Sequence, residues 1–250
     1  MGVEKAYPKI NIFLKITGAD GEYHLIKSRM KLVKNFYDTI EIREGPKFNI
    51  FADEVNCVLR ENSVFLAYYN LIKRYPEFRE WFIGKEIHIR KQIPEMAGLG
   101  GGSSDAAAFL RLVNRLGGFG LSKEELAEIG QQVGSDVPFF IYGYETANVS
   151  GRGEIIEPFE EEELEFEILT PPIECATGEV YRYYRYHLFN PSDPGWEKVP
   201  TVELLANYSP SQLNDLLPAA LALCPDLYKY KDWGFMSGSG SSFFRLKGEI

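Results

Sequence analysis

Near its beginning, the chain alternates apolar and polar side chains. Ile10, Ile12, Leu14 and Ile16 occupy every second position. Side chains two residues apart lie on the same face of a strand, so this pattern predicts a strand with one buried face. Shorter patterns of the same kind predict further strands at about residues 28–34, 38–44, 47–52, 85–91 and 164–169.

Helices are predicted from capping residues and from apolar periodicity. Asn62 and Ser63 are candidate caps of a helix that runs to about Tyr75, just before Pro76. Ser122 and Glu125 have the spacing of a capping box, which predicts the start of another helix. The remaining helices are expected at about 103–117, 177–186, 201–207 and 218–232, and two short strands are expected around a glycine turn at 238–240.

The order of these elements favours an α+β fold with mixed or antiparallel sheets, because strands come first and no regular βαβ alternation follows. The segment 143–153 has a glycine at each end and is interpreted as a crossing between two halves. We therefore expect an N-terminal domain over 1–150 and a C-terminal domain over 151–250.

Composition and charge narrow the classes of partner. The net charge of −9 argues against a broad surface for nucleic acid or for an anionic membrane. The three cysteines, Cys57, Cys175 and Cys224, do not have the number or spacing of a disulfide framework or a zinc site. The sequence has neither an apolar signal core nor a stretch long enough to span a membrane. We therefore expect a soluble, cytoplasmic protein whose partner is a small molecule.

The strongest chemical signal is a glycine-rich segment before an alanine-rich helix. It reads Pro-Glu-Met-Ala-Gly-Leu-Gly-Gly-Gly-Ser-Ser-Asp over residues 94–105. Gly98 and residues 100–102 carry no Cβ, so the backbone can wrap closely around a ligand and point several N–H groups at it. The positive end of the next helix dipole faces the same place, and Ser103 and Ser104 add hydroxyl groups. We predict a phosphate-binding loop rather than a flexible turn capped by serine.

Familiar phosphate-binding and nucleophile motifs do not fit this segment. A Walker loop requires Lys after its last glycine, where this chain has Ser103. The dinucleotide fingerprint requires a glycine at that same position. A nucleophile elbow fails because Asp105 stands where it needs glycine, and the sequence lacks the protein-kinase motifs. The segment is therefore interpreted as a phosphate loop of another kind.

Three segments, in order along the chain, resemble the motifs of the GHMP kinases, the superfamily of galactokinase, homoserine kinase and mevalonate kinase. Residues 94–104 resemble its ATP-binding loop, and residues 6–14 (Ala-Tyr-Pro-Lys-Ile-Asn-Ile-Phe-Leu) resemble its first motif. Residues 236–243 (Met-Ser-Gly-Ser-Gly-Ser-Ser-Phe) resemble its third, a glycine turn that closes over the active site. The resemblance implies a two-domain GHMP kinase fold with the active site in the cleft between the domains. It also implies ATP as co-substrate, with Mg²⁺. The implied ATP-binding residues are Asn62, Pro94, Glu95, Met96, Ala97, Gly98, Leu99, Gly100, Gly101, Gly102, Ser103 and Ser104.

Smaller features resemble one branch of this superfamily, whose substrate is 4-diphosphocytidyl-2-C-methyl-D-erythritol. They lie at residues 9–11, 23–24, 134–140, 176–181 and 213–216. The resemblance implies that ATP phosphorylates the 2-hydroxyl of that substrate, a step toward isoprenoid precursors. The implied substrate-binding residues are Asn11, Tyr23, His24, Thr177 and Tyr181. Of these, Tyr23 and Tyr181 are expected to stack on the cytosine, and His24 to bind its edge.

The same resemblance gives Asp136 and Lys9 catalytic roles. A tertiary alcohol is a poor nucleophile, so a base must take its proton while the O–P bond forms. Asp136 is the expected base, and Lys9 is expected to keep it ionised and to stabilise charge on the phosphoryl oxygens. Without the matched motifs, Asp136 would be interpreted as a turn residue before a strand and Lys9 as a solvated strand lysine. Asn62 can be both a helix cap and an adenine contact.

Two alternative functions remain open from the sequence. Another GHMP kinase, of the homoserine or mevalonate type, would share the fold and the ATP loop, but the Tyr23–His24 pair and Asp136 favour a cytidine-bearing substrate. A catalytically inactive binding protein with this fold should have lost Lys9, Asp136 or the glycines, and the sequence retains them all.

Ser103 and Asp136 are candidate magnesium contacts, but no full ligand set is predicted. The loop before Tyr23 is one residue shorter than the usual pattern, which affects the path of that loop.

Overall fold

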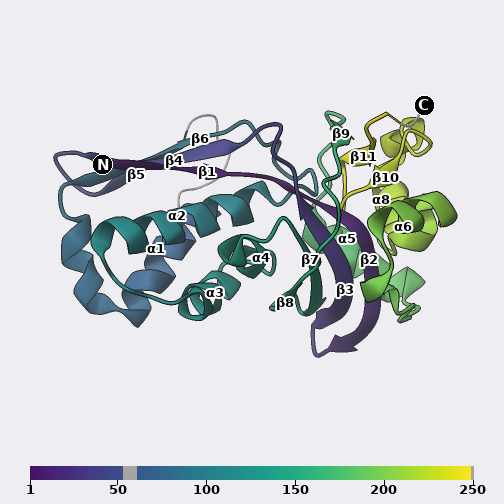
Figure 1. Cartoon of the computed structure of the whole chain (residues 1–250), viewed down its shortest axis with the longest axis horizontal. Coiled ribbons are helices and arrows are strands. Elements are labelled where there is room, and N and C mark those ends of the chain that lie inside the picture. The colour runs from purple at the N-terminus through teal and green to yellow at the C-terminus, as the bar shows by residue number, and fades with distance from the viewer. Residues whose placement is uncertain (53–60, 249–250) are drawn as a thin grey trace. The chain divides into compact units, whose positions relative to one another are not determined.

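The computed structural model describes residues 1–52 and 61–248, which form two compact units (Figure 1). Neither unit is continuous in sequence. The first comprises residues 1–8, 34–93 and 100–144, and the second comprises residues 9–33, 94–99 and 145–250. Both units combine helices with sheets, which confirms the predicted α+β class. The expected division into 1–150 and 151–250 stays a prediction.

The first unit is a mixed sheet with helices on one of its faces (Figure 1). The strand order is β1-β4-β6-β5; β4 is antiparallel to both of its neighbours, and β5 is parallel to β6. The strands are β1 (Gly2–Ala6), β4 (Asp38–Glu44), β5 (Asn49–Ala52) and β6 (Lys85–Arg90). The helices are α1 (Ser63–Arg74), α2 (Gly101–Gly117), α3 (Lys123–Gln131) and α4 (Val137–Tyr142), with a 3₁₀ turn at Pro76–Phe82.

Helix α2 is central to the first unit, with nine of its 17 residues buried. Every residue from 104 to 110 is buried. The helix packs against β1 and β4 of the sheet and against α1, α3 and α4. The alanines at 106–108 are fully buried and let these neighbours approach the backbone closely. The N-terminal turn of α2, which carries the end of the glycine-rich segment, is therefore fixed by packing on several sides.

The second unit contains two antiparallel sheets. One has the order β2-β3-β7-β8, and the other has the order β10-β11-β9. The strands are β2 (Lys9–Asp20), β3 (Tyr23–Leu32), β7 (Thr146–Gly151), β8 (Ile155–Pro158), β9 (Phe166–Leu169), β10 (Phe235–Met236) and β11 (Phe243–Leu246).

Short helices complete the second unit. They are α5 (Thr177–Tyr183), α6 (Thr201–Asn207), α7 (Pro210–Leu213) and α8 (Leu217–Leu223), with a π-helical turn at Tyr184–Leu188 and 3₁₀ turns at Trp196–Lys198 and Pro225–Lys229. The core of the unit forms where Leu14 and Ile16 of β2 pack with Val180 of α5 and Leu217 of α8. Among the described residues, no helix is long and apolar enough to cross a membrane.

Local structure departs from the sequence-based expectations at two places. The segment after Asp136 is the helix α4 rather than a strand, and Pro138 at its start has the fixed φ angle that suits a first helical turn. The expected helix at 218–232 ends at Leu223, because Pro225 restricts the residue before it and the chain continues as a 3₁₀ turn. The chain passes from the first unit to the second at residues 144–145, within the segment 143–153 that was interpreted as a crossing, and this segment also contains the strand β7, paired with both β3 and β8.

Candidate active site

Helix α2 begins at Gly101, two residues before the expected start at Ser103. Its N-cap is Gly100, which has a left-handed backbone with φ +70°. Glycine adopts this conformation without the steric cost of a Cβ atom. No side chain caps the first turn of the helix. Its leading N–H groups therefore suit an anion, and a phosphate group is the expected one.

In the second unit, Gly98 of the ATP-loop motif contacts both the first motif, through Lys9, and the third motif, through Ser237. Its backbone has φ +73°, and a Cβ atom there would lie 2.2 Å from the carbonyl oxygen of Ser237. The Gly98 carbonyl oxygen accepts hydrogen bonds from Lys9 Nζ at 3.0 Å and from Ser237 Oγ at 2.9 Å. Only glycine fits this position, so the third motif can lie directly on the second.

Lys9 is buried, with 3% of its surface exposed, and its amine is oriented by hydrogen bonds. Lys9 Nζ donates to Asn11 Oδ1 at 2.5 Å, and Asn11 Nδ2 donates to Ser28 Oγ at 2.8 Å. The Asn11 side chain thus joins Lys9 to β3. Asn11 was expected to bind substrate, and the structure gives it a second task, which is to hold the lysine.

Asp136 lies in the first unit, at the N-cap position of α4, but its side chain does not cap that helix. The turn that carries it contains Gly134, where a Cβ atom would lie 3.2 Å from Ser103 Oγ. The first turn of α2 and the turn that holds Asp136 are therefore next to each other. Ser103 therefore lies beside the turn that carries Asp136, and a shared magnesium contact of these two residues stays a prediction.

Asn62 caps α1, because its Oδ1 accepts from the N–H groups of Val64 at 2.9 Å and Phe65 at 3.3 Å. The capping interpretation of Asn62 is confirmed, and its role in adenine binding stays a prediction. Ser63 Oγ lies 3.3 Å from the position of a Cβ atom on Gly102. The start of α1 is thus in contact with the start of α2.

His24 lies in a cluster of aromatic rings in the second unit. Its ring centroid is 5.2 Å from that of Tyr181, 6.1 Å from Tyr184 and 6.3 Å from Phe189. Tyr23 is 57% exposed, and the Arg152 guanidinium lies over its ring at 4.5 Å. The structure brings His24 together with Tyr181, while the stacking of cytosine between Tyr23 and Tyr181 stays a prediction.

Two polar atoms in this aromatic cluster are buried without a hydrogen-bond partner among the described residues, namely His24 Nε2 and Arg185 Nη1. Arg185 Nη2 donates to the Gly21 carbonyl oxygen at 2.8 Å, which ties it to the β2–β3 turn. Burial, and secondarily the charge of Arg185, lower the pKa of His24. A neutral imidazole can both donate and accept a hydrogen bond, so His24 and Arg185 together can bind the polar edge of a ring. Sequence reasoning missed Arg185, whose only signal is its helical spacing of four residues from Tyr181.

Thr177 joins α5 to the third motif. Its Oγ1 lies 2.9 Å from Ser239 Oγ. Thr177 and Ser239 are both in the second unit, and Thr177 is the first residue of α5, four positions before Tyr181. The glycine turn at 238–240 is therefore connected to the helix that carries the aromatic cluster.

Asp105 follows the two loop serines and is 3% exposed. Burial raises the pKa of its carboxyl from 3.8 to about 7, against the opposing effect of Lys91. Between those pH values the folded protein holds a proton that the unfolded chain has lost. We therefore expect this group to increase stability by on the order of 2 kcal/mol as pH falls from 8 to 5.5. Urea unfolding at pH 8 and pH 5.5 measures this difference in the free energy of unfolding. The Asp105→Asn variant should lack the gain that comes from Asp105. An equal pH dependence of stability in both proteins would contradict a raised pKa of Asp105.

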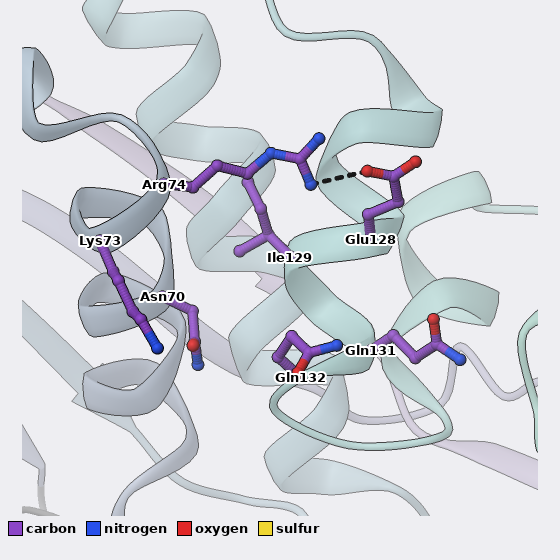
Figure 2. A pocket seen from close by; sticks show the side chains of 7 residues that line it. All are labelled: Asn70, Lys73, Arg74, Glu128, Ile129, Gln131 and Gln132. Atoms are coloured by element: carbon purple, nitrogen blue, oxygen red, sulfur yellow. Dashed lines mark ion pairs between the residues drawn. The ribbon is translucent and has the colours of Figure 1, made fainter.

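A separate polar hollow of about 480 Å³ lies between α1 and α3 (Figure 2). Helix α1 contributes Asn70, Lys73 and Arg74, and the end of α3 contributes Glu128, Ile129, Gln131 and Gln132. Arg74 Nη1 forms an ion pair with Glu128 Oε2 at 2.6 Å. None of the residues expected to bind ATP or substrate lines this hollow, so it is distinct from the candidate site.

Within residues 1–52 and 61–248, no group of three or more His, Cys, Asp or Glu side chains could hold a metal ion. The donors at the candidate site are the Ser103 hydroxyl and the Asp136 carboxylate. This donor set fits Mg²⁺, which keeps several waters and binds through one or two carboxylates plus substrate phosphates. It does not fit a metal held entirely by protein ligands.

Comparison with known proteins places this fold in one class of kinases. Residues 62–144 match the family model of the GHMP kinases N terminal domain. The crystal structure of a 4-(cytidine 5′-diphospho)-2C-methyl-D-erythritol kinase is 28% identical with a TM-score of 0.78, covering 99% of this chain and 90% of that one. The Methanococcus jannaschii mevalonate kinase structure is 16% identical with a TM-score of 0.62, covering 98% and 90%. The fold is that of the GHMP kinases.

Relatives with a similar sequence identify one family within the GHMP kinases. The 4-diphosphocytidyl-2-C-methyl-D-erythritol kinase of Sulfurovum sp. (strain NBC37-1) is 46% identical over 97% of this chain and 98% of its own. The kinase of the same name from Sulfurimonas denitrificans is 42% identical over 99% and 97%. The one from Campylobacter jejuni (strain 81116) is 41% identical over 97% and 99%. The chain belongs to the 4-diphosphocytidyl-2-C-methyl-D-erythritol kinase family of GHMP kinases, and it is a phosphotransferase.

Proposed function

We propose that this enzyme transfers the γ-phosphoryl group of ATP to the 2-hydroxyl of 4-diphosphocytidyl-2-C-methyl-D-erythritol, in the route to isoprenoid precursors. The observation that carries the proposal is the junction at Gly98, where the amine of Lys9 and the third glycine motif bind the same carbonyl oxygen. The relatives at 41–46% identity favour this substrate over homoserine or mevalonate, and over an inactive binding protein. The net charge of −9 argues against a broad surface for nucleic acid or for an anionic membrane, and a cytoplasmic location stays part of the proposal.

The glycine loop would bind the phosphates of ATP through backbone N–H groups. Residues 100–102 combine a left-handed N-cap with the uncapped first turn of α2, so several donors are available to one phosphate group. Asn62 and the start of α1, which touches Gly102 through Ser63, are proposed to bind near the adenine. Ser103 and Asp136 are the residues that would hold Mg²⁺, which supplies charge neutralisation on the phosphate oxygens.

The transfer itself would need a base and a cation. Asp136 is the proposed base that accepts the proton of the substrate hydroxyl as the new O–P bond forms. Lys9 is the proposed cation that stabilises charge on the transferred phosphoryl group. Its amine is fixed by Asn11 and Gly98, so little reorganisation is needed when that charge develops.

The cytidine part of the substrate would bind at the aromatic cluster. Tyr181 offers a ring for stacking, and Tyr23 is proposed as the second ring. His24 Nε2 and Arg185 Nη1 are buried without partners among the described residues, which supports a ligand with a polar edge at this place. Thr177, at the start of the same helix, is proposed to contact the substrate beyond the base.

A coupled assay of ADP release tests the proposal directly. Purified enzyme is supplied with ATP, Mg²⁺ and either 4-diphosphocytidyl-2-C-methyl-D-erythritol, homoserine or mevalonate. We expect efficient turnover of the first substrate only. Efficient phosphorylation of homoserine, with no activity on the cytidine substrate, would overturn the proposed substrate while leaving the kinase class intact.

Substitutions in the aromatic cluster should have graded effects on the cytidine substrate. Base–aromatic stacking contributes about 1–3 kcal/mol per ring, so Tyr181→Ala should raise KM for this substrate by about 5- to 150-fold, and Tyr181→Phe should be nearly silent. His24→Ala should lower kcat/KM most, because a polar group of the ligand loses its partner in a buried place. Steady-state kinetics with both substrates varied measures this.

The control for these substitutions is Tyr186→Ala, which removes a ring that is 72% exposed in the adjacent π-helical turn. It should leave all constants unchanged. The KM for ATP should stay constant in every variant of the set. If His24→Ala had no effect on kcat/KM for the cytidine substrate, the base would have to bind elsewhere.

A further inference from the structure

Three charged side chains form a buried cluster beside the glycine loop, in the first unit. Lys91 Nζ lies 2.5 Å from Asp38 Oδ2 and 2.6 Å from Asp105 Oδ2. The side chains of Lys91, Asp38 and Asp105 are 12%, 0% and 5% exposed. Asp38 opens β4, Lys91 follows β6, and Asp105 lies in the second turn of α2. The cluster therefore joins three elements of the unit at one point.

Asp38 also holds the backbone that enters the glycine loop. Its Oδ1 accepts from the N–H groups of Gln92 at 2.5 Å and Ile93 at 2.8 Å. Ile93 in turn packs on the first turn of α2, since its Cγ2 lies 2.9 Å from the position of a Cβ atom on Gly101. The residues just before the loop and the helix just after it are thus fixed to each other.

Lys91 is the cation that both carboxylates share, and Asp38 also accepts two backbone N–H groups. The other oxygen of Asp105, Oδ1, is buried without a hydrogen-bond partner among the described residues. An ion pair of this kind is costly to bury, and apolar side chains of similar volume often stabilise a fold as well or better. Stability alone therefore does not account for the cluster. The cluster also fixes the position of the glycine loop. It links Lys91 and the backbone of residues 92–93, which precede the loop, to Asp105 of α2, which follows it.

We propose that Lys91 is a positioning residue for nucleotide binding: by bridging Asp38 and Asp105 it holds the first turns of α2 against the segment that enters the glycine loop. The loop N–H groups are then arranged before the nucleotide arrives, and less ordering is required on binding. In this role Lys91 acts through the loop. This inference rests on the proposed use of ATP. Its test measures nucleotide affinity, which does not depend on the identity of the phosphate acceptor.

The test compares Lys91→Met with Lys91→Arg at pH 8, where the Asp105 carboxyl is largely ionised. We expect Lys91→Met to raise the KM for ATP and the Kd for ADP by about 10- to 100-fold, with kcat at saturating ATP within about threefold of wild type. Lys91→Arg should recover most of the affinity because it keeps the charge. The control Lys85→Met, a partly exposed lysine on β6, should change neither constant. An unchanged Kd for ADP in folded Lys91→Met would overturn the proposal, and so would a loss confined to kcat.

Lys91→Met leaves two buried carboxylates without a cation, a change that strongly destabilises a fold by itself. The double variant Lys91→Met/Asp105→Asn removes one of these charges, while Asp38 keeps its two backbone N–H partners. We expect the same loss of ADP affinity in this variant, measured by calorimetry. Wild-type ADP affinity in the folded double variant would overturn the proposal. A wild-type enzyme that binds ADP but does not phosphorylate the cytidine substrate would instead overturn the proposed function.

Discussion

Asp136→Asn should lower kcat by about 10²- to 10⁴-fold, the range that general base catalysis contributes. The amide has nearly the same shape as the carboxylate but cannot accept the proton of the substrate hydroxyl. Asp136 does not cap α4, so its loss should not destabilise that helix. Stopped or steady-state assays of ADP formation across pH 6–9 measure the effect.

Two further measurements make the Asp136 result specific. The Kd for ADP should stay close to wild type, since the phosphate loop is intact. The control Asp226→Asn removes a carboxylate that is 72% exposed and paired with Lys229, and it should retain full activity. Near wild-type kcat in Asp136→Asn at every pH would show that another group takes the proton.

Gly98→Ala should lower kcat/KM by on the order of 10²-fold or more, because a small displacement at a catalytic junction can cost that much. The new Cβ would lie 2.2 Å from the Ser237 carbonyl oxygen, so the backbone of one motif must shift. Alanine at φ +73° also carries a strain of about 1–2 kcal/mol. Because the Gly98 carbonyl oxygen accepts a hydrogen bond from Lys9, the shift would displace the Lys9 amine as well.

Gly120→Ala separates the two causes. Gly120 has φ +70° but no atom within 4 Å of a Cβ position. It therefore carries the same backbone strain without the contact, and we expect it to lower stability but not kcat/KM. Equal kinetic effects of the two substitutions, or full activity in Gly98→Ala, would mean that the contact with Ser237 does not matter for catalysis.

The sequence by itself determined those features that depend on neighbours a few residues apart. The alternation of Ile10 to Ile16 predicted the strand β2, and the spacing of Ser122 and Glu125 predicted the capping box of α3, which the structure confirms. The expectation of a single buried face for β2 was wrong, because residues 9–16 are buried on both faces. The glycine segment before α2 was recognisable because glycine and a helix start are local requirements of a phosphate loop. Such features are fixed by backbone sterics and hydrogen bonds within one element, so a linear pattern contains them.

Proline and glycine positions mark where local patterns mislead. The helix expected at 218–232 looked continuous from its apolar residues, but Pro225 ends it. The strand β7, within the segment 143–153, was not predicted, and it pairs with β3 and β8. Strand pairing is a property of partners far away in the chain, and the segment itself does not contain it.

Only the tertiary structure decided which side chains meet. The Gly98 carbonyl binds Lys9 and Ser237, which are 89 and 139 residues away in sequence. Lys91 bridges two carboxylates that are 53 and 14 residues away, and Arg185 reaches the turn at Gly21 across 164 residues. No periodicity or spacing encodes such contacts, because they arise when separate elements are packed and their buried polar groups must find partners. The sequence thus determined the chemistry that is available, and packing decided which residues Lys9 and Lys91 contact.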